Sequence, residues 1–121
     1  MGMTITESQA TLDLRFPTTG GTDHVAYSAN GTTETASLAR TAVGVTGWAA
    51  ATATDPSVKA NAAILNTATA SVGVTVTHFA IYTAVTAGAQ RTDWRPLTAP
   101  RTLAAAEGTS WAIGALQITL T

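Results

Sequence analysis

The stretch from Val72 to Thr86 (VGVTVTHFAIYTAVT) constrains the fold most, because it lies inside the longest run without a proline or a charged residue. Its β-branched and aromatic residues suit a pleated, half-buried surface. Read with a period of two, neither face is purely polar, so both faces are expected to be covered. A helix is disfavoured here, since β-branched side chains lose rotamer freedom in one. We therefore predict a central strand.

Shorter segments with alternating polarity and turn signals between them occur along the rest of the chain. Asn30-Gly31 is a strong turn signal, and Pro96 and Pro100 confine any strand around them to a sheet edge. The segment from Glu34 to Val43 favours a strand, although its alanines would also tolerate a helix. Further strands are expected over Ala10–Phe16, His24–Ser28, Glu34–Val43, Val58–Thr67, Arg95–Pro100, Arg101–Ala105, Thr109–Ile113 and Leu116–Leu120. This pattern predicts an all-β fold, an antiparallel β-sandwich or jelly-roll-like domain of about eight short strands.

The N-terminal region divides into a polar arm, residues 1–9, and a domain spanning residues 10–121. Within Ala10–Phe16 (ATLDLRF) apolar and charged residues alternate, which predicts a half-buried strand. An arm followed by a strand can lie on a larger body and add an edge to its sheet. The residues expected to make such partner contacts are Thr4, Ile5, Thr6, Leu12 and Leu14.

The composition indicates a chain that functions packed against other proteins. Charged residues make up only 11% of the sequence, and threonine and alanine together supply about two-fifths. A free monomer normally stays soluble through interspersed charge. We therefore expect a homo-oligomer or many copies on a larger assembly. The alternative is a soluble secreted β-domain with a threonine-rich face.

Several classes of function are disfavoured by charge and composition. The net charge is −1 and the 6 basic residues do not cluster, so a nucleic-acid surface is not expected. Without cysteine there is no disulfide or thiolate metal site. No apolar run approaches the roughly 20 residues of a membrane span, and the N-terminus lacks the layout of a signal peptide. We expect either a cytosolic protein or one released by a route other than ordinary secretion.

No catalytic or metal-binding motif is recognisable. His24 and His78 lie in expected strands without metal-ligand spacing or an identifiable carboxylate partner, so both are interpreted as structural. A glycosidase pair could be hidden among the carboxylates, but these fall mostly in expected turns. We expect no enzyme activity, no cofactor and no metal.

The three tryptophans differ in their sequence context. Trp48 and Trp111 are interpreted as core anchors. The remaining one belongs to a polar loop whose candidate binding residues are Arg91, Asp93, Trp94 and Arg95. An aromatic residue between arginines can bind a sugar or anchor a protein interface, and it can equally close one end of a sandwich. Both interpretations remain open.

The chain from His24 onwards resembles a family of small structural proteins from tailed phages of actinobacteria, described as minor tail, tail-fibre or head-decoration proteins. The similar segments include HVAYS at 24–28 with Asn30-Gly31, LARTAV at 38–43, NAAI at 61–64, VTVTHFAIY at 74–82, and LTAP at 97–100 through GALQITL at 114–120. Order and spacing agree over about four-fifths of the chain. The Ala29-Asn30-Gly31 turn, the polar loop before Pro96 and the Met1–Phe16 region depart from the family pattern.

The resemblance implies a non-enzymatic virion protein with no catalytic residues to transfer. We expect head decoration, with the chain bound to the major capsid protein on the outside of the shell. A decoration protein needs only a compact domain and a short extended segment, and the chain has no heptad or collagen-like repeat. The alternative is a minor tail or tail-fibre protein. A second alternative is a carbohydrate-binding β-sandwich module that grips a glycan with its polar loop.

Overall fold

The structure is a computed structural model that describes residues 4–16, 23–44, 47–54 and 56–120. Its contacts divide the chain into two compact units. The sheet unit comprises Thr22–Ala42 and Leu65–Ser110, and the helix unit comprises Met1–Gly21, Val43–Ile64 and Trp111–Thr121. The described residues form one helix and eight short strands, and the pairs β1–β2, β1–β5, β5–β6 and β3–β8 are antiparallel. The predicted all-β, antiparallel β-sandwich class of about eight strands is confirmed.

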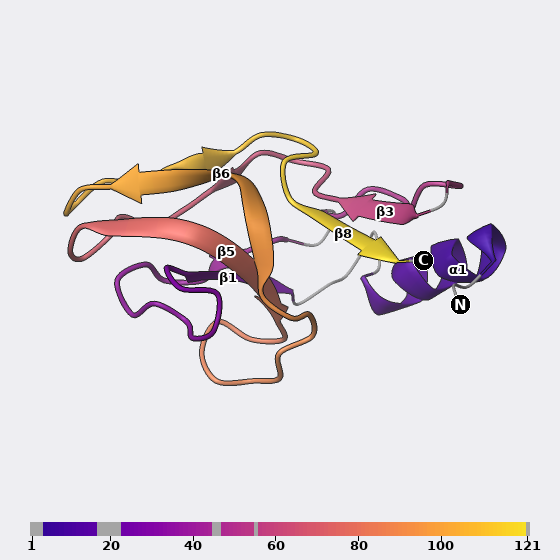
Figure 1. Cartoon of the computed structure of the whole chain (residues 1–121), viewed down its shortest axis with the longest axis horizontal. Helices are drawn as coiled ribbons and strands as arrows, with labels where there is room; N and C mark the ends of the chain where they lie inside the picture. The colour runs from indigo at the N-terminus through magenta and orange to yellow at the C-terminus, as the bar shows by residue number, and fades with distance from the viewer. Residues whose placement is uncertain (1–3, 17–22, 45–46, 55, 121) are drawn as a thin grey trace. The chain divides into compact units, whose positions relative to one another are not determined.

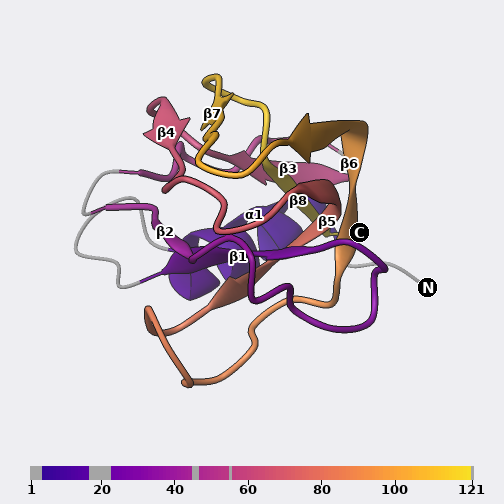
Figure 2. The same ribbon diagram turned by 90° about the vertical axis from the view of Figure 1, so that its left-hand side faces the viewer.

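The sheet unit is built on four antiparallel strands in the order β2-β1-β5-β6 (Figure 1; β2 is labelled in Figure 2). They are β1 (His24–Ser28), β2 (Thr41–Ala42), β5 (Val74–Tyr82) and β6 (Arg95–Leu103). Strand β5 pairs with β1 on one side and with β6 on the other. The expected central strand is therefore confirmed, with shorter ends than the sequence pattern indicated.

The core of the sheet unit lies along β1 and β5. Val25 stands opposite Ile81 and Tyr27 opposite Phe79, and these four side chains are buried. Ala26 and Ala80, which point to the other face, are buried as well. Both faces of this strand pair are thus covered, as the mixed polarity of the sequence predicted.

Strand β6 forms one edge of the four-stranded sheet. It contains Pro96 and Pro100, which have no N–H to donate, and its register against β5 shifts between Val76 and His78. Most of its residues are exposed or half-buried. The edge position predicted from the two prolines is confirmed. Beyond β5, the loop of residues 83–94 that leads to β6 extends away from the sheet, as Figure 2 also shows.

The helix unit contains a two-stranded ladder of β3 (Ser57–Ala60) and β8 (Gln117–Leu120). Helix α1 (Ile5–Arg15) packs on this ladder, and Figure 1 draws it in indigo beside β8. Ser8, Leu12 and Phe16 are buried, and they are spaced four residues apart. This spacing places the three on one side of the helical turn.

The expectation of a strand over Ala10–Phe16 was wrong. Thr4 caps the helix by accepting a hydrogen bond from the Glu7 amide at 3.2 Å. A threonine followed three residues later by glutamate is the pattern of a capping box, and it was the overlooked signal. Leu14, expected to point inward, is 81% exposed. The expected division between residues 9 and 10 falls within this helix.

Two other expected strands are mostly irregular. Of the segment from Glu34 to Val43, only β2 is a strand, and the rest forms bends and a loop. The segment from Val58 to Thr67 is interrupted between β3 and β4 (Leu65–Asn66). The remaining short strand is β7 (Ser110–Trp111). Among the described residues, no helix is long and apolar enough to cross a membrane.

Candidate functional site

The strongest candidate site is the β5–β6 loop, defined here as residues 83–94, with the side chains that support it from the sheet unit. The loop is reached from Tyr82, the last residue of β5, and it ends next to Arg95, the first of β6. Ala87 and Gly88 both have positive φ, at 53° and 72°, so the loop reverses in a tight, left-handed turn.

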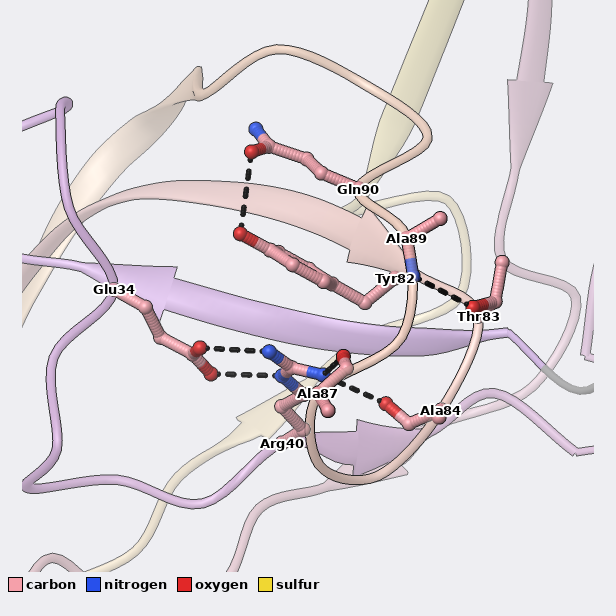
Figure 3. A network of polar contacts seen from close by, with 8 residues as sticks. All are labelled: Glu34, Arg40, Tyr82, Thr83, Ala84, Ala87, Ala89 and Gln90. Carbon is pink, nitrogen blue, oxygen red and sulfur yellow. Dashed lines mark hydrogen bonds and ion pairs between the residues drawn. The ribbon is translucent and has the colours of Figure 1, made fainter.

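Arg40 supports this turn through hydrogen bonds to the loop backbone. It makes two hydrogen bonds of 2.8 Å to the two carboxylate oxygens of Glu34. Its Nη1 donates to the carbonyl oxygens of Ala84 at 2.9 Å and Ala87 at 2.6 Å, and Figure 3 shows this arrangement. The hydrogen-bonded Glu34 carboxylate raises the pKa of Arg40 above its usual value. Arg40 therefore stays charged and holds the loop backbone in place.

Two aromatic rings continue the arrangement towards the surface. The guanidinium carbon of Arg40 lies 3.9 Å from the centroid of the Tyr82 ring, a cation–π contact. The Tyr82 and Trp94 ring centroids are 6.2 Å apart, with the planes tilted by 51°. The Tyr82 hydroxyl donates to Gln90 Oε1 at 3.2 Å, as Figure 3 shows. Tyr82 is thus in contact with both Arg40 and Trp94.

A second arginine fixes the far side of the loop. Arg91 Nη1 lies 2.6 Å from Oδ1 of Asp23, whose side chain is only 1% exposed. The amide of Arg91 also donates to the carbonyl of Ile81 at 2.7 Å. A buried carboxylate of this kind needs its cation, so the pair anchors the loop to the residue preceding β1.

The four predicted loop residues differ in accessibility. Asp93 is 82% exposed and Arg95 is 32% exposed, and they form a long ion pair of 3.4 Å. Trp94 is half-buried against Tyr82, and Arg91 is 25% exposed beside Asp23. The structure therefore gathers all four at one end of the sheet, with Arg91 paired to a buried carboxylate and Asp93 the most exposed of the four. Their binding role stays a prediction.

Sequence reasoning did not assign Arg40, Glu34 or Tyr82 to this site. Glu34 and Arg40 come from one segment and Tyr82 from another, and the pairing of β5 with β1 and of β1 with β2 brings the two segments together. The one available signal was Arg40 itself, a lone cation in an otherwise small and uncharged stretch from Thr35 to Gly44.

The expected N-terminal contact residues lie on or beside α1. Thr4 and Thr6 are exposed, Ile5 is 43% exposed and Leu14 is 81% exposed. Leu12 is only 3% exposed, so its side chain is taken up by the chain's own core. A helix satisfies its backbone groups internally, so this segment cannot add an edge strand to a partner sheet. Any partner contact must use exposed side chains, and that role stays a prediction.

Helix α1 is fixed to the helix unit by polar contacts around Asp13. Its Oδ1 lies 2.6 Å from Nζ of Lys59, and it accepts a hydrogen bond from the Ala51 amide at 2.9 Å. Gln9 donates to the Ala51 carbonyl at 3.1 Å. The Phe16 ring meets Trp48 edge-on at 5.6 Å. The helix thus belongs to the packed unit and is not a loose arm over its described part.

The histidines and the other tryptophans take structural positions. Both histidines are half-buried, and Nδ1 of His78 hydrogen-bonds Oγ1 of Thr77 at 2.8 Å. Trp48 and Trp111 are each 2% exposed, which confirms their interpretation as core anchors. Over the described parts of the chain, no group of three His, Cys, Asp or Glu side chains is placed to hold a metal ion.

The comparison with protein families bears on residues 4–119. A family model described as "Podophage GP4 fiber I protein gp80" matches this range, which is nearly the whole chain. The chain belongs to this family. No curated protein matches this gp80-family chain.

Membership supports the expected class of protein, a structural component of a bacteriophage virion. The description of the family names a fibre and a podophage, and neither word shows that the host is an actinobacterium. The fibre description fits the tail-fibre alternative at least as well as head decoration.

Proposed function

We propose that this gp80-family chain is a non-enzymatic component of a phage tail fibre. The observation that carries the proposal is the match of a fibre-protein family over residues 4–119. The antiparallel all-β fold is compatible with it, because the described residues form a scaffold that displays a loop. A tail location replaces head decoration as the favoured role.

The structure also removes one of the two arguments that favoured decoration, the one based on the N-terminus. That argument needed a strand near the N-terminus that extends a sheet of the capsid protein. Residues 5–15 are helical, and their backbone groups bond within the helix.

Contacts with neighbouring virion proteins are proposed to involve the exposed surface of α1, in particular Ile5 and Leu14. An aspartate in place of Leu14 leaves the core untouched, since that side chain is 81% exposed. We expect Leu14→Asp to reduce incorporation of the chain into particles. Ile113→Asp is the matched control, because Ile113 is 66% exposed in the same unit. Equal incorporation of both variants and the native chain would remove α1 from the proposed interface.

The location is tested by immunogold electron microscopy with an antibody to this chain and by mass-spectrometric copy number per particle. We expect gold at the tail and a small copy number. Labelling over the head with hundreds of copies would overturn the proposal, because a shell offers hundreds of equivalent sites and a tail does not. Purified particles provide both measurements from one preparation.

A further inference from the structure

We propose that Trp94 is the platform of a binding site for a neutral sugar ring, at the end of the sheet from which the β5–β6 loop extends. This inference does not depend on the place of the chain in the virion, because it concerns the isolated protein. It rests on the accessibility of one indole ring, the rigidity of its support, and the polar groups and charges around it.

Trp94 differs from the other two tryptophans in its exposure. Trp48 and Trp111 are each 2% exposed, whereas Trp94 is half-buried. Its indole N–H has no hydrogen-bond partner among the residues that the structure describes, and its one ring contact is with Tyr82. Indole N–H groups usually find a partner, and tryptophan is enriched where one part of the ring meets a ligand. Trp94 therefore offers an apolar surface and an unused donor.

The support of Trp94 is pre-organised. Tyr82 lies against it, Arg40 lies against Tyr82, and Arg40 is itself held by the Glu34 carboxylate and two loop carbonyls. On the other side of the loop, Arg91 is paired with a buried aspartate. A ligand that stacks on Trp94 thus does not have to order the loop, and this lowers the entropic cost of binding.

The polar groups beside the ring match sugar hydroxyls, which both donate and accept hydrogen bonds. The Asp93 carboxylate next to Trp94 is 82% exposed, and it forms an ion pair with Arg95 Nε at 3.4 Å. It can therefore accept from a hydroxyl, while the indole N–H donates. An apolar face with a donor and an acceptor at its edge is the combination that a pyranose ring requires.

The local charges pair off and favour a neutral ligand. Three ion pairs surround the site: Arg40 with Glu34, Arg91 with Asp23, and Arg95 with Asp93. Among the described residues of this site, each arginine is paired with a carboxylate, which disfavours an acidic sugar or a phosphate backbone. A nucleic acid would also meet the exposed Asp93, and like charges repel.

A protein partner fits this surface less well than a sugar. Stable protein interfaces bury about 800 Å² on each partner. The large apolar groups that this loop offers are one half-buried indole and Val85, which is 57% exposed. A single sugar ring, by contrast, is covered by one indole.

The test is a titration of intrinsic tryptophan fluorescence with methyl glycosides of glucose, galactose and mannose, followed by an array of neutral and acidic oligosaccharides. Because the other two tryptophans are buried, a change in emission reports on Trp94. We expect a saturable change with at least one neutral glycoside, at millimolar concentrations for a monosaccharide. On the array, Trp94→Ala should lower binding at least tenfold, and Trp94→Phe should retain part of it.

Thr98→Ala, at an exposed position of β6, is the matched control and should bind as the native chain does. Circular dichroism of each variant confirms that the sheet is intact. The proposal is overturned if no neutral glycan binds, if Trp94→Ala binds undiminished, or if the array shows a preference for acidic sugars. A protein ligand that needs Trp94, with no glycan binding, would also overturn it. Each of these failures leaves the tail-fibre proposal standing, since gold labelling and copy number decide that separately.

Discussion

The ammonium of Lys59 and the carboxylate of Asp13 lie 2.6 Å apart, and the two side chains differ sharply in exposure. Lys59 is 0% exposed, whereas Asp13 is 41% exposed. The lysine belongs to β3 and the aspartate to α1, so the pair joins the helix to the ladder within the helix unit. The hydrogen bond from Lys59 is the main cause that holds the pKa of the Asp13 carboxyl below its ordinary value. The buried Lys59 ammonium needs the Asp13 carboxylate as its counter-ion, and this ion pair holds the helix on the ladder.

Replacing Asp13 by alanine should destabilise the helix unit, because it leaves the Lys59 ammonium buried without its anion. Breaking a wholly buried pair costs roughly 3–5 kcal/mol, and we expect about 2 kcal/mol here because the aspartate is partly exposed. Chemical denaturation followed by circular dichroism measures the loss. Lys59→Met is the control: it removes the buried charge and fills the same space, so its loss should be smaller. A larger loss in Lys59→Met than in Asp13→Ala would contradict this account.

The attachment of α1 should weaken in acid. A carboxylate whose folded-state pKa is depressed contributes stability that is fully present above its unfolded pKa, about 3.9. That stability is lost as the pH falls from there through the lower folded-state pKa. Hydrogen exchange of the α1 amides, measured between about pH 5 and pH 2.5, should show protection declining in this window. Asp13→Asn should show a flatter dependence, and an unchanged slope in that variant would assign the effect to another group.

Asn61 should be intolerant of substitution. Its side chain is buried, donates to the carbonyls of Ala63 and Ala112 at 2.9 Å each, and accepts from the Leu116 amide at 3.0 Å. Asn61→Ala leaves these groups without their partner, and each unsatisfied buried group costs about 1–3 kcal/mol. We expect a loss of about 3 kcal/mol in the free energy of unfolding. Asn66→Ala, at an exposed position, should stay within about 0.5 kcal/mol of the native chain.

Alanine substitutions at Gly88 and Gly44 should distinguish the cost of backbone strain from the cost of a steric clash. Both glycines have positive φ, at 72° and 89°. A Cβ at Gly88 would lie 2.7 Å from Oγ1 of Thr83, whereas a Cβ at Gly44 would meet nothing within 4 Å. Gly44→Ala should cost about 1 kcal/mol from the left-handed backbone alone. Gly88→Ala should cost more, and thermal unfolding of both variants checks the order. Equal losses of stability in the two variants would mean that the loop rearranges to accommodate the added methyl group at residue 88.

Arg40→Lys should loosen the β5–β6 loop while the sheet persists. Lysine keeps the charge but cannot make the paired hydrogen bonds to Glu34 together with those to the loop carbonyls. Hydrogen exchange of residues 84–91 should quicken severalfold, and the amides of β1 should keep their protection. The same substitution at Arg15, an exposed residue of α1, should leave the loop unaffected. Unaltered exchange in Arg40→Lys would show that other contacts hold the loop.

Some elements of the fold were predictable because one local rule decided them. Strand β1 begins and ends at the expected residues, His24 and Ser28, and Gly31 has the positive φ of 77° that the Asn-Gly turn implied. The helix α1 was missed because its apolar residues satisfy two periods at once. Leu12 and Phe16 fit both a strand and a helix, and only the burial of Ser8 and the exposure of Leu14 distinguish them.

The candidate site was predictable only in part, for a different reason. The residues Arg91 to Arg95 are contiguous, so composition was enough to mark them. Arg40 and Tyr82 are distant in sequence, and their contact depends on the register of three strands. Register is set by the packing of a whole sheet, which no local window contains. The residues that hold a loop in place are thus harder to predict from a sequence than the residues of the loop itself.

The two prolines of β6 have a consequence for backbone pairing between copies of this chain. A sheet edge with a full set of free N–H groups can pair with strands of other chains, and such edge-to-edge pairing can continue from chain to chain. Because Pro96 and Pro100 have no N–H, β6 carries fewer backbone donors and is a poorer template for that growth. We therefore expect this edge to resist fibrillar growth, so that side-chain contacts, rather than backbone pairing, would define a neighbouring copy.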